Sequence, residues 1–356
     1  MDFVHDSLRQ RIRFGSHRAA ENLAAEVAGR SARRVMVIAT EGQRATAERI
    51  TAGIDVALWH SEVVMHVPVE VARRARDAAA DAGVDLVVGI GGGSTTGLAK
   101  ALAMSGSPVA GVPVVAVPTT YAGSEVTTVW GLTDGGTKTT GTDDAVLPAA
   151  VVYDAALHTS LPADLSVASG LNALAHCVDA MWGPRVDPVD QVLAGEGIAA
   201  LAAGLPAVLA DPAGLAGRER TLYGAYLAGV AFASAGSGLH HKVCHVLGGM
   251  FDLPHAQTHA VVLPHVLALN APHAPDAAAR IARSFGAGTA TAGLHELRRR
   301  LGAPRALRDL GMPEAGIARA VPAVLAAVPP GNPAPVTEHD VTALLRAAWA
   351  GTEPAR

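Results

Sequence analysis

Cysteine, aromatic residues and excess charge are all scarce in this 356-residue sequence. The two cysteines, Cys177 and Cys244, are too few for a disulfide framework and stand in no CxxC pair. We therefore expect both to be small buried hydrophobic residues of a protein in a reducing compartment. The formal net charge is only -4, so no basic surface for nucleic acid or anionic lipid is expected.

Long uninterrupted hydrophobic runs are also missing. The N-terminal stretch MDFVHDSLRQRIRFG has no signal-peptide core, and no later stretch gives 18 apolar residues without glycine or charge. We therefore expect a cytoplasmic protein without a membrane partner. Half of the residues are hydrophobic although aromatics make up only 4%, and the frequent alanines suit closely packed helices.

The length and the order of patterns predict two domains. In the first part, β-branched runs alternate with helical patterns, which is typical of a parallel sheet covered on both faces. From about residue 155 only long Ala/Leu/Val helices follow. We predict a doubly wound, Rossmann-like α/β domain over residues 1–155 and an all-helical domain over residues 156–356. The expected strands and helices, in chain order, are residues 33–40, 44–54, 69–84, 85–90, 94–104 and 113–119.

A glycine run separates a buried strand from a helix in DLVVGIGGGSTTGLAK. Free backbone N–H groups and the positive end of a helix can bind a phosphate at such a turn. The next strand ends in PTTYAGSE, whose hydroxyls belong to the same sheet edge, the usual ligand crevice of open α/β folds. The expected dinucleotide contacts are Gly91, Gly92, Gly93, Ser94, Thr119, Thr120 and Ser124.

Glu41 follows the first predicted strand. A carboxylate there can accept hydrogen bonds from a ribose diol and repel a 2′-phosphate. This favours NADH over NADPH, which stays possible. The alternative is that Glu41 is an ordinary exposed turn residue.

Histidines are concentrated in GSGLHHKVCHVLGG. On a helix, His241 and His245 share a face while His240 points elsewhere. The pair Asn172 and His176 has the same spacing in SGLNALAHCVDA. Burying imidazoles without partners is costly, so this concentration in an alanine-rich domain predicts a functional site.

A third helix adds His255, directly after a proline, and His259 one turn further on. Zinc or ferrous iron takes imidazole and carboxylate ligands from different helices. Asn172, however, carries an amide where a carboxylate would face the histidines, and the next acids, Asp179 and Glu196, need not point inward. The sequence therefore disfavours a functional metal without excluding one.

The same segment could instead act on a substrate directly, through its positive and proton-donating side chains. Imidazolium groups of His241 and His245, with the ammonium of Lys242, would supply protons and positive potential to an anionic substrate.

Four motifs, GGGSTTGLAK, PTTYAGSE, HHKVCHVLGG and LPHAQTHAVVLPH, occur in an order that resembles the iron-containing alcohol dehydrogenase superfamily over nearly the full chain. Within it the sequence is most similar to the maleylacetate reductase subfamily. The features behind this narrower likeness are Tyr121, Gly97, the HHK triplet, the QTH segment and Asn172. The resemblance implies the dehydroquinate synthase-like architecture, a homodimer, and a reaction in the cleft between the two domains.

Residue roles follow from the resemblance by position. His245 falls on the histidine beside the nicotinamide, and Lys138 matches a lysine near the cofactor, although it could be a solvated loop residue. Metal-free enzymes of the subfamily share the amide at position 172. The metal-ligand places of the iron enzymes fall on Asn172, His176, His241 and His255.

The implied activity is the NADH-dependent reduction of the conjugated double bond of maleylacetate, a small dicarboxylate keto acid, to 3-oxoadipate. A zinc- or iron-dependent alcohol or aldehyde dehydrogenase remains the main alternative. A lyase of the dehydroquinate synthase type and a metal-buffering protein are the others, although metal buffering has no use for the glycine loop.

Overall fold

The computed structural model describes residues 2–135 and 137–354, without the side chains of Thr137 and Lys138. The chain divides into one unit of residues Leu8–Leu161 and a second unit that joins the N-terminal residues up to Ser7 to those from Pro162 onward. The expected boundary at residue 155 is slightly too early, because Leu157 and His158 still pack in the first unit, against its apolar core and the ring of Tyr121.

The first unit is built on a six-stranded, wholly parallel sheet, as predicted, in the order β1-β8-β5-β4-β2-β3. The central strands are buried along their whole length, which explains their continuous apolar sequences. The strands are β1 (Arg11–Phe14), β2 (Val35–Ile38), β3 (Val56–His60), β4 (Leu86–Gly91), β5 (Val114–Pro118) and β8 (Ala150–Tyr153).

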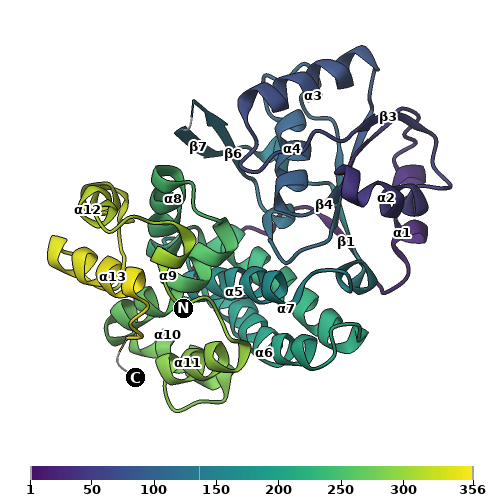
Figure 1. The fold of residues 1–356 in the computed structure, drawn as a ribbon. Helices are drawn as coiled ribbons and strands as arrows, with labels where there is room; N and C mark the ends of the chain where they lie inside the picture. Colours follow the sequence, from purple (N-terminus) through teal and green to yellow (C-terminus); the bar gives the residue numbers. More distant parts are fainter. Residues whose placement is uncertain (1, 136, 355–356) are drawn as a thin grey trace. The chain divides into compact units, whose positions relative to one another are not determined.

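Helices cover both faces of this sheet (Figure 1). Helices α1 (Ala19–Gly29) and α2 (Arg44–Ile50) pack on one face, where they meet alternate residues of β2 such as Val37. Helices α3 (Val69–Asp81) and α4 (Gly93–Ala103) pack on the other face, against Met36 and its neighbours. The alternation of side chains along each strand thus gives the unit two separate apolar cores.

The strand order reverses at the centre of the sheet. From β2 the chain moves outward to β3 and then returns to the other side of β2 to form β4, β5 and β8. In open α/β sheets the carboxyl ends of strands at such a reversal form the ligand-binding edge. An antiparallel hairpin of β6 (Val129–Asp134) and β7 (Thr137–Thr142), which was not predicted, lies outside the sheet.

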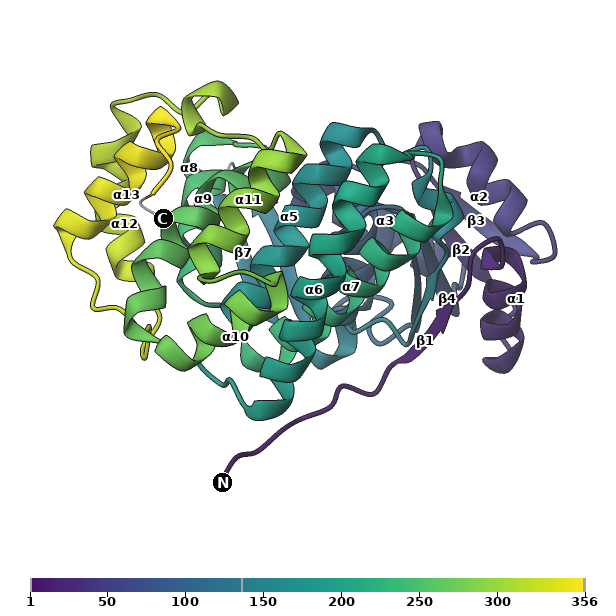
Figure 2. The same ribbon diagram turned by 90° about the horizontal axis from the view of Figure 1, so that it is seen from below.

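The second unit is helical, as predicted. Helix α5 packs against α6, α7, α8 and α9, and almost every residue after its first turn is buried. Figure 2 gives a second view of these helices and of the extended N-terminal segment. The helices are α5 (Ala163–Ala180), α6 (Pro188–Ala210), α7 (Leu215–Ala235), α8 (Leu239–Phe251), α9 (His255–Asn270), α10 (Pro275–Phe285), α11 (Ala290–Leu301), α12 (Gly316–Ala327) and α13 (Glu338–Ala350).

Glycines bring α6 and α7 into close contact. A Cβ atom on Gly204 would lie 2.7 Å from the backbone nitrogen of Thr221, and one on Gly217 would lie 2.8 Å from that of Val208. By length and composition α6 could cross a membrane, and the pair α7 and α8, bent by 98°, passes the same test. Because α6 packs against α5, α7 and α10, we interpret it as a core helix.

The C-terminal helix α13 begins with a capping box. Thr337 accepts the backbone N–H of Asp340, whose carboxylate accepts the backbone N–H of Thr337 in return. Helices α8, α9, α12 and α13 share one apolar core below the histidine-bearing segments. This core fixes α8 against α9.

Candidate functional site

The glycine loop and the threonine loop meet at the carboxyl edge of the sheet. The backbone N–H of Thr119 donates to the carbonyl of Gly91 over 2.9 Å. A Cβ atom on Gly92 would lie 3.1 Å from a methyl carbon of Thr120, and one on Gly93 would lie 3.3 Å from Ala122. The two loops therefore meet within the first unit, as the sequence analysis expected.

Gly91 has no room for a side chain. A Cβ atom there would collide with the hydroxyl of Thr95 and lie 2.8 Å from Oε1 of Gln43. Gln43 in turn donates from Nε2 to the hydroxyl of Thr119 over 2.8 Å. Gln43 follows β2 in the chain, so side chains from three neighbouring strand ends interlock here, and the sequence analysis had not named Gln43.

The first turn of α4 leaves its backbone N–H groups available. Gly92 is the N-cap residue, and no side chain of the described residues caps the helix. Ser94 lies half-buried in this first turn. Such an end attracts an anion through free donors and the helix dipole. The start of α4 thus provides donors of the kind that bind a phosphate group.

Glu41 follows the end of β2, the strand that pairs with β4 in the sheet. Its side chain is exposed in the short 3-10 helix Glu41–Gln43. This places the carboxylate at the strand reversal that forms the ligand edge of the unit. The predicted cofactor residue Lys138 lies in β7, but its side chain is outside the described part of the structure.

Lys100, a buried residue that the sequence analysis did not single out, holds the predicted contact residue Ser124 in place. Its Nζ donates to the carbonyl oxygens of Ser124, over 2.9 Å, and Thr127, over 2.8 Å. It also reaches the Thr127 hydroxyl at 3.1 Å. Burial lowers the pKa of Lys100 to about 7. The signal in the sequence was a lone lysine inside the apolar helix GLAKALAM.

The neighbouring Glu125 is also buried and takes a hydrogen bond of 2.9 Å from the hydroxyl of Tyr153. Burial raises the pKa of its carboxyl group. Lys100 and Glu125 together anchor the segment after β5 to α4 and β8. The threonine loop is consequently held rigidly against the glycine loop.

In the helical unit, α5, α8 and α9 bring the predicted histidines together. The rings of His176 and His241 stack with centroids 4.8 Å apart and planes 16° apart. Phe232 of α7 covers both rings, at 4.7 Å and 4.3 Å. Asn172 is buried on the same face of α5 as His176, and its Oδ1 has no hydrogen-bond partner in the described part of the chain. Unpaired buried acceptors are expensive, so Asn172 faces a place suited to a polar group.

Asp179 points into the cluster, which the sequence analysis had left open. Its Oδ2 lies 2.6 Å from Nδ1 of His241 and accepts the backbone N–H of the same residue over 3.2 Å. The contact fixes the orientation of the His241 ring, and the ring's Nε2 is buried with no hydrogen-bond partner among the residues that the structure describes. Asp179 stands three residues after His176 and seven after Asn172, so helical spacing places all three on one face.

His240 also joins the cluster, whereas the sequence analysis had placed it elsewhere. Its Nε2 lies 2.9 Å from Nδ1 of His259, which belongs to α9. The His259 ring in turn lies 4.7 Å from that of His241 and 4.3 Å from that of His255. Because α8 packs on α9, His240 and His241 both contact the cluster although they point to different sides of α8.

The more accessible members of the cluster are His245, His255 and Lys242. His245 and Lys242 are half-buried, and His255 is exposed at the start of α9. The His245 ring lies 6.2 Å from His241 and 6.3 Å from His255. These three side chains can approach a bound molecule, while the buried rings form the floor behind them.

Burial controls the charge of this floor. It lowers the pKa of His176 to about 4 and that of His240 to about 3, and it lowers the pKa values of His241 and His259 well below the ordinary value for histidine. Burial also raises the pKa of Asp179 to about 7. Burial therefore disfavours the imidazolium form of His241 that the sequence analysis predicted.

The donor set that this cluster offers to a divalent ion contains no free carboxylate. The four positions suggested by the resemblance offer an amide and three imidazoles, and the single buried carboxylate nearby, that of Asp179, already contacts His241. The compact triad of possible ligands is instead His240, His241 and His259, two of which bond to each other. Neither set brings a carboxylate ligand to offset the charge of the ion.

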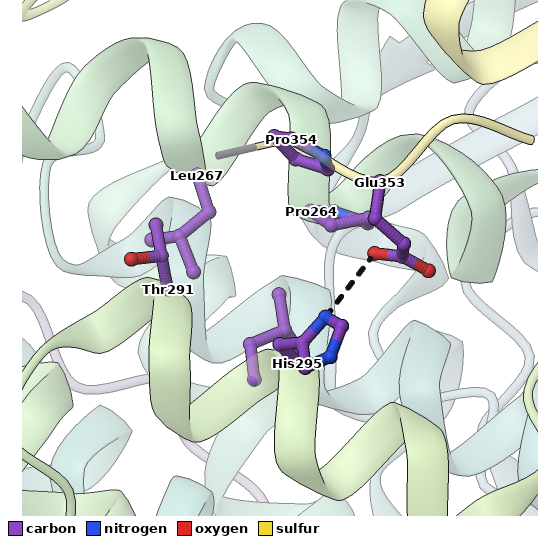
Figure 3. A pocket seen from close by; sticks show the side chains of 7 residues that line it. Pro264, Leu267, Thr291, His295, Glu353 and Pro354 are labelled. Atoms are coloured by element: carbon purple, nitrogen blue, oxygen red, sulfur yellow. Dashed lines mark ion pairs between the residues drawn. The ribbon is translucent and has the colours of Figure 1, made fainter. Parts of the chain in front are cut away.

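A separate pocket lies among α9, α11 and the C-terminal residues (Figure 3). Its volume is about 10 Å³, room for roughly one water molecule. His295 and Glu353 form an ion pair of 3.8 Å at its edge. The pocket is too small for an organic substrate, so it is not the candidate site.

Comparisons with known proteins agree with these features. Residues 9–155 match the model of iron-containing alcohol dehydrogenases and residues 166–349 that of the C-terminal part of the family. A maleylacetate reductase of Sphingobium indicum is 46% identical over 99% of both chains. An iron-containing alcohol dehydrogenase structure from Corynebacterium glutamicum matches with a TM-score of 0.96 at 55% identity, covering 99% of this chain and 98% of its own.

A structure of maleylacetate reductase from Agrobacterium tumefaciens matches with a TM-score of 0.93 at 40% identity, covering 99% of this chain and all of its own. These matches span both units and include the glycine loop and the histidine helices. The chain belongs to the iron-containing alcohol dehydrogenase family.

Proposed function

We propose that the protein reduces the double bond of maleylacetate with NADH and forms 3-oxoadipate, in the breakdown of hydroxyquinol, resorcinol or chlorinated aromatic compounds. As a member of its family it is an NAD(P)H-dependent oxidoreductase. The narrower assignment is supported by the 46% identity with the Sphingobium indicum maleylacetate reductase over nearly all of both chains. The amide at position 172 supports it from the chemistry of the site.

The α/β unit is proposed to hold NADH. The free N–H groups at the start of α4 would receive the pyrophosphate, and Gly91 gives the backbone the room it needs. Glu41 would accept hydrogen bonds from the ribose diol and disfavour the 2′-phosphate of NADPH. Thr119, Thr120 and Ser124 would line the same edge, with Ser124 positioned by Lys100.

The helical unit is proposed to hold the substrate. Hydride adds to the alkene carbon β to the ketone, and the electron pair of the double bond moves to the ketone oxygen as an enolate, which then takes up a proton. One well-placed hydrogen-bond donor stabilises such an oxyanion by ~3 kcal/mol. His245 is our first candidate for this donor, with His241 and Lys242 beside it, and Lys242 would also attract a substrate carboxylate.

The single observation that carries the metal-free form of this proposal is the uncharged donor set around Asn172. A simple carbonyl is well polarised by a Lewis-acid metal, whereas an enolate conjugated in this way needs only hydrogen-bond donors. A bound metal in this family would polarise the substrate oxygen. We propose that the residues described here do this instead, and that a zinc- or iron-dependent alcohol or aldehyde dehydrogenase is the alternative.

The decisive experiment is an anaerobic NADH-oxidation assay with maleylacetate and, separately, simple aldehydes, each with and without a chelator. We expect oxidation with maleylacetate only, unchanged by chelation. Loss of activity on chelation and recovery on adding metal would support the alternative, and no net NADH consumption would point to a lyase. His245→Ala should bind NADH normally but turn over at least ~100-fold more slowly. Near-normal turnover of this variant would refute the role of His245.

Location and assembly are part of the same proposal. We expect a cytoplasmic homodimer whose partners are small molecules, with no role for nucleic acid or membrane. The weak net charge of -4 supports this expectation. Size-exclusion chromatography with light scattering tests the dimer.

A further inference from the structure

A second cluster of possible metal ligands lies in the helical unit, apart from the histidine floor. It joins His5 of the N-terminal segment to Asp187 and Asp190 at the start of α6. Nδ1 of His5 lies 2.7 Å from Oδ2 of Asp187 and 3.8 Å from Oδ1 of Asp190. The His5 side chain is 17% exposed, while those of the two aspartates are 2% and 0% exposed. The cluster thus has one open side.

The cap of α6 fixes both carboxylates. Oδ1 of Asp187 accepts the backbone N–H groups of Val189 and Asp190, over 2.7 Å and 3.0 Å. Oδ2 of Asp190 accepts the backbone N–H of Asp187 over 3.3 Å. Each carboxylate therefore has one oxygen engaged in the helix cap and the other directed toward His5.

The oxygen that Asp190 directs toward His5 is not satisfied. This Oδ1 is fully buried and makes no hydrogen bond of ordinary geometry among the described residues, and the Ser234 hydroxyl interacts with the Asp190 carboxylate without meeting that geometry. A buried carboxylate oxygen without a partner is costly, and buried charges normally pair or coordinate a metal. This oxygen is a second observation, beyond the grouping of acids, that points to a missing ligand.

A protonated His5 imidazole can form a hydrogen bond with only one of the two carboxylates. Its Nδ1 hydrogen can serve Asp187 at 2.7 Å, but 3.8 Å is too long for a hydrogen bond to Asp190. One positive charge then faces two carboxylates. A divalent cation offers two charges, and it bonds to several donors at once rather than to one.

The spacing of the donors suits such an ion. Zinc binds imidazole nitrogen and carboxylate oxygen at ~2.0–2.2 Å, so two donors on one ion are separated by roughly 3.0–3.5 Å. The separations of 2.7 Å and 3.8 Å lie on either side of this value. Small rotations of the partly exposed His5 side chain suffice to correct them. The hydroxyl of Ser234, 3.4 Å from Nδ1 of His5, and water on the open side can complete the coordination.

We propose that His5, Asp187 and Asp190 bind a divalent transition-metal ion of the Zn²⁺ type, which fastens the N-terminal segment to the start of α6. This site is structural and independent of the reaction. It supplies two carboxylates, whereas the buried carboxylate of Asp179 in the histidine cluster already contacts His241.

The test uses Co²⁺ as a visible substitute for zinc, added to metal-free full-length protein. Binding is measured by equilibrium dialysis and by the visible absorption of the bound ion. We expect the native protein to bind one Co²⁺ per chain more than His5→Gln or Asp190→Asn. Asp309→Asn, which removes an exposed aspartate elsewhere in the unit, should bind like the native protein. Any ions held by the histidine cluster remain in all four proteins and cancel in the comparison.

His5→Gln keeps the test valid if Asp190→Asn fails to fold, because His5 takes no part in the cap of α6. A second measurement follows the tryptic cut after the exposed Arg9. Co²⁺ should slow this cut several-fold in the native protein and in Asp309→Asn, but not in His5→Gln. Equal ion numbers and equal cutting rates in native and His5→Gln protein would overturn the proposal. Neither measurement uses turnover, so the result is independent of the proposed reaction.

Discussion

The carboxylate of Asp179 lies 2.6 Å from Nδ1 of His241 and links α5 to α8 inside the histidine cluster. We predict that Asp179→Asn lowers kcat about 10- to 100-fold, because residues that orient a reacting imidazole typically contribute this much. The amide still accepts the backbone N–H of His241, so the fold should persist. Steady-state kinetics and circular dichroism test this, with Asp309→Asn as control. An unchanged kcat would show that the orientation of His241 does not matter.

Gly91 provides a test of the proposed cofactor edge. Gly91→Ala places a methyl group against Thr95 and Gln43, so we expect NADH to bind at least ~10-fold more weakly and stability to fall by ~1–3 kcal/mol. Gly53→Ala is the matched control, since nothing lies within 4 Å of its Cβ position. NADH fluorescence titration and thermal unfolding give the two readouts. Equal NADH affinity in both variants would place the cofactor elsewhere.

Glu41 should determine the choice between the two nicotinamide cofactors. We predict that Glu41→Gln raises the ratio of kcat/KM for NADPH to that for NADH about 10-fold, because the repulsion of the 2′-phosphate is removed. Glu70→Gln, an exposed change on α3, should leave the ratio unaltered. The ratio is measured with maleylacetate at saturation. A ratio that stays constant in Glu41→Gln would mean that this carboxylate does not face the ribose.

Lys100 should give the protein a distinctive pH dependence. Its pKa is lowered to about 7 by burial, so between pH 7 and 10 the unfolded chain binds a proton that the folded chain does not. The stability from this group therefore rises with pH in that window, by up to ~1.4 kcal/mol per pH unit, and is lost as pH falls through 7. Lys100→Met should remove this rise. Denaturant unfolding at pH 7, 8 and 9 measures it.

The control for Lys100→Met is Arg73→Met, which removes an exposed positive charge from α3. It should keep the native rise with pH, since arginine does not titrate there. Parallel pH curves for native protein and Lys100→Met would contradict the prediction. Lys100→Met should also weaken NADH binding, because the segment around Ser124 loses its anchor.

The sequence predicted the central strands of the sheet but missed β1, β3 and β8. Strands β2, β4 and β5 are buried on both faces and read as continuous apolar runs. The edge strands β1, RIRF, and β3, VALWH, are partly exposed and carry polar residues, so they lack this pattern. Strand β8 is as short and as fully buried as the predicted strand β2, so its apolar sequence AVVY could have been recognised as a strand. Both edge strands form because they pair with a neighbouring strand of the sheet, and their own sequences do not indicate it.

In the candidate site, residues related by helical spacing could be predicted and those related by packing could not. His241 and His245 share a helix face, and so do Asn172 and His176. The spacing that pairs Asn172 with His176 also includes Asp179, so this residue could have been found. The contact between His240 and His259 depends on how α8 meets α9, and the neutral state of the rings depends on burial. Neither is visible in a linear sequence.

The N-terminal residues up to Ser7 belong to the helical unit, although the chain from Leu8 to Leu161 builds the other one. The polypeptide therefore passes between the units twice, and a single cut cannot yield two complete halves. A fragment that begins at Pro162 would lack the histidine that meets the acids of the α6 cap. To produce the helical unit by itself, a rearranged gene would have to join the N-terminal residues to the segment from Pro162 by a new linker.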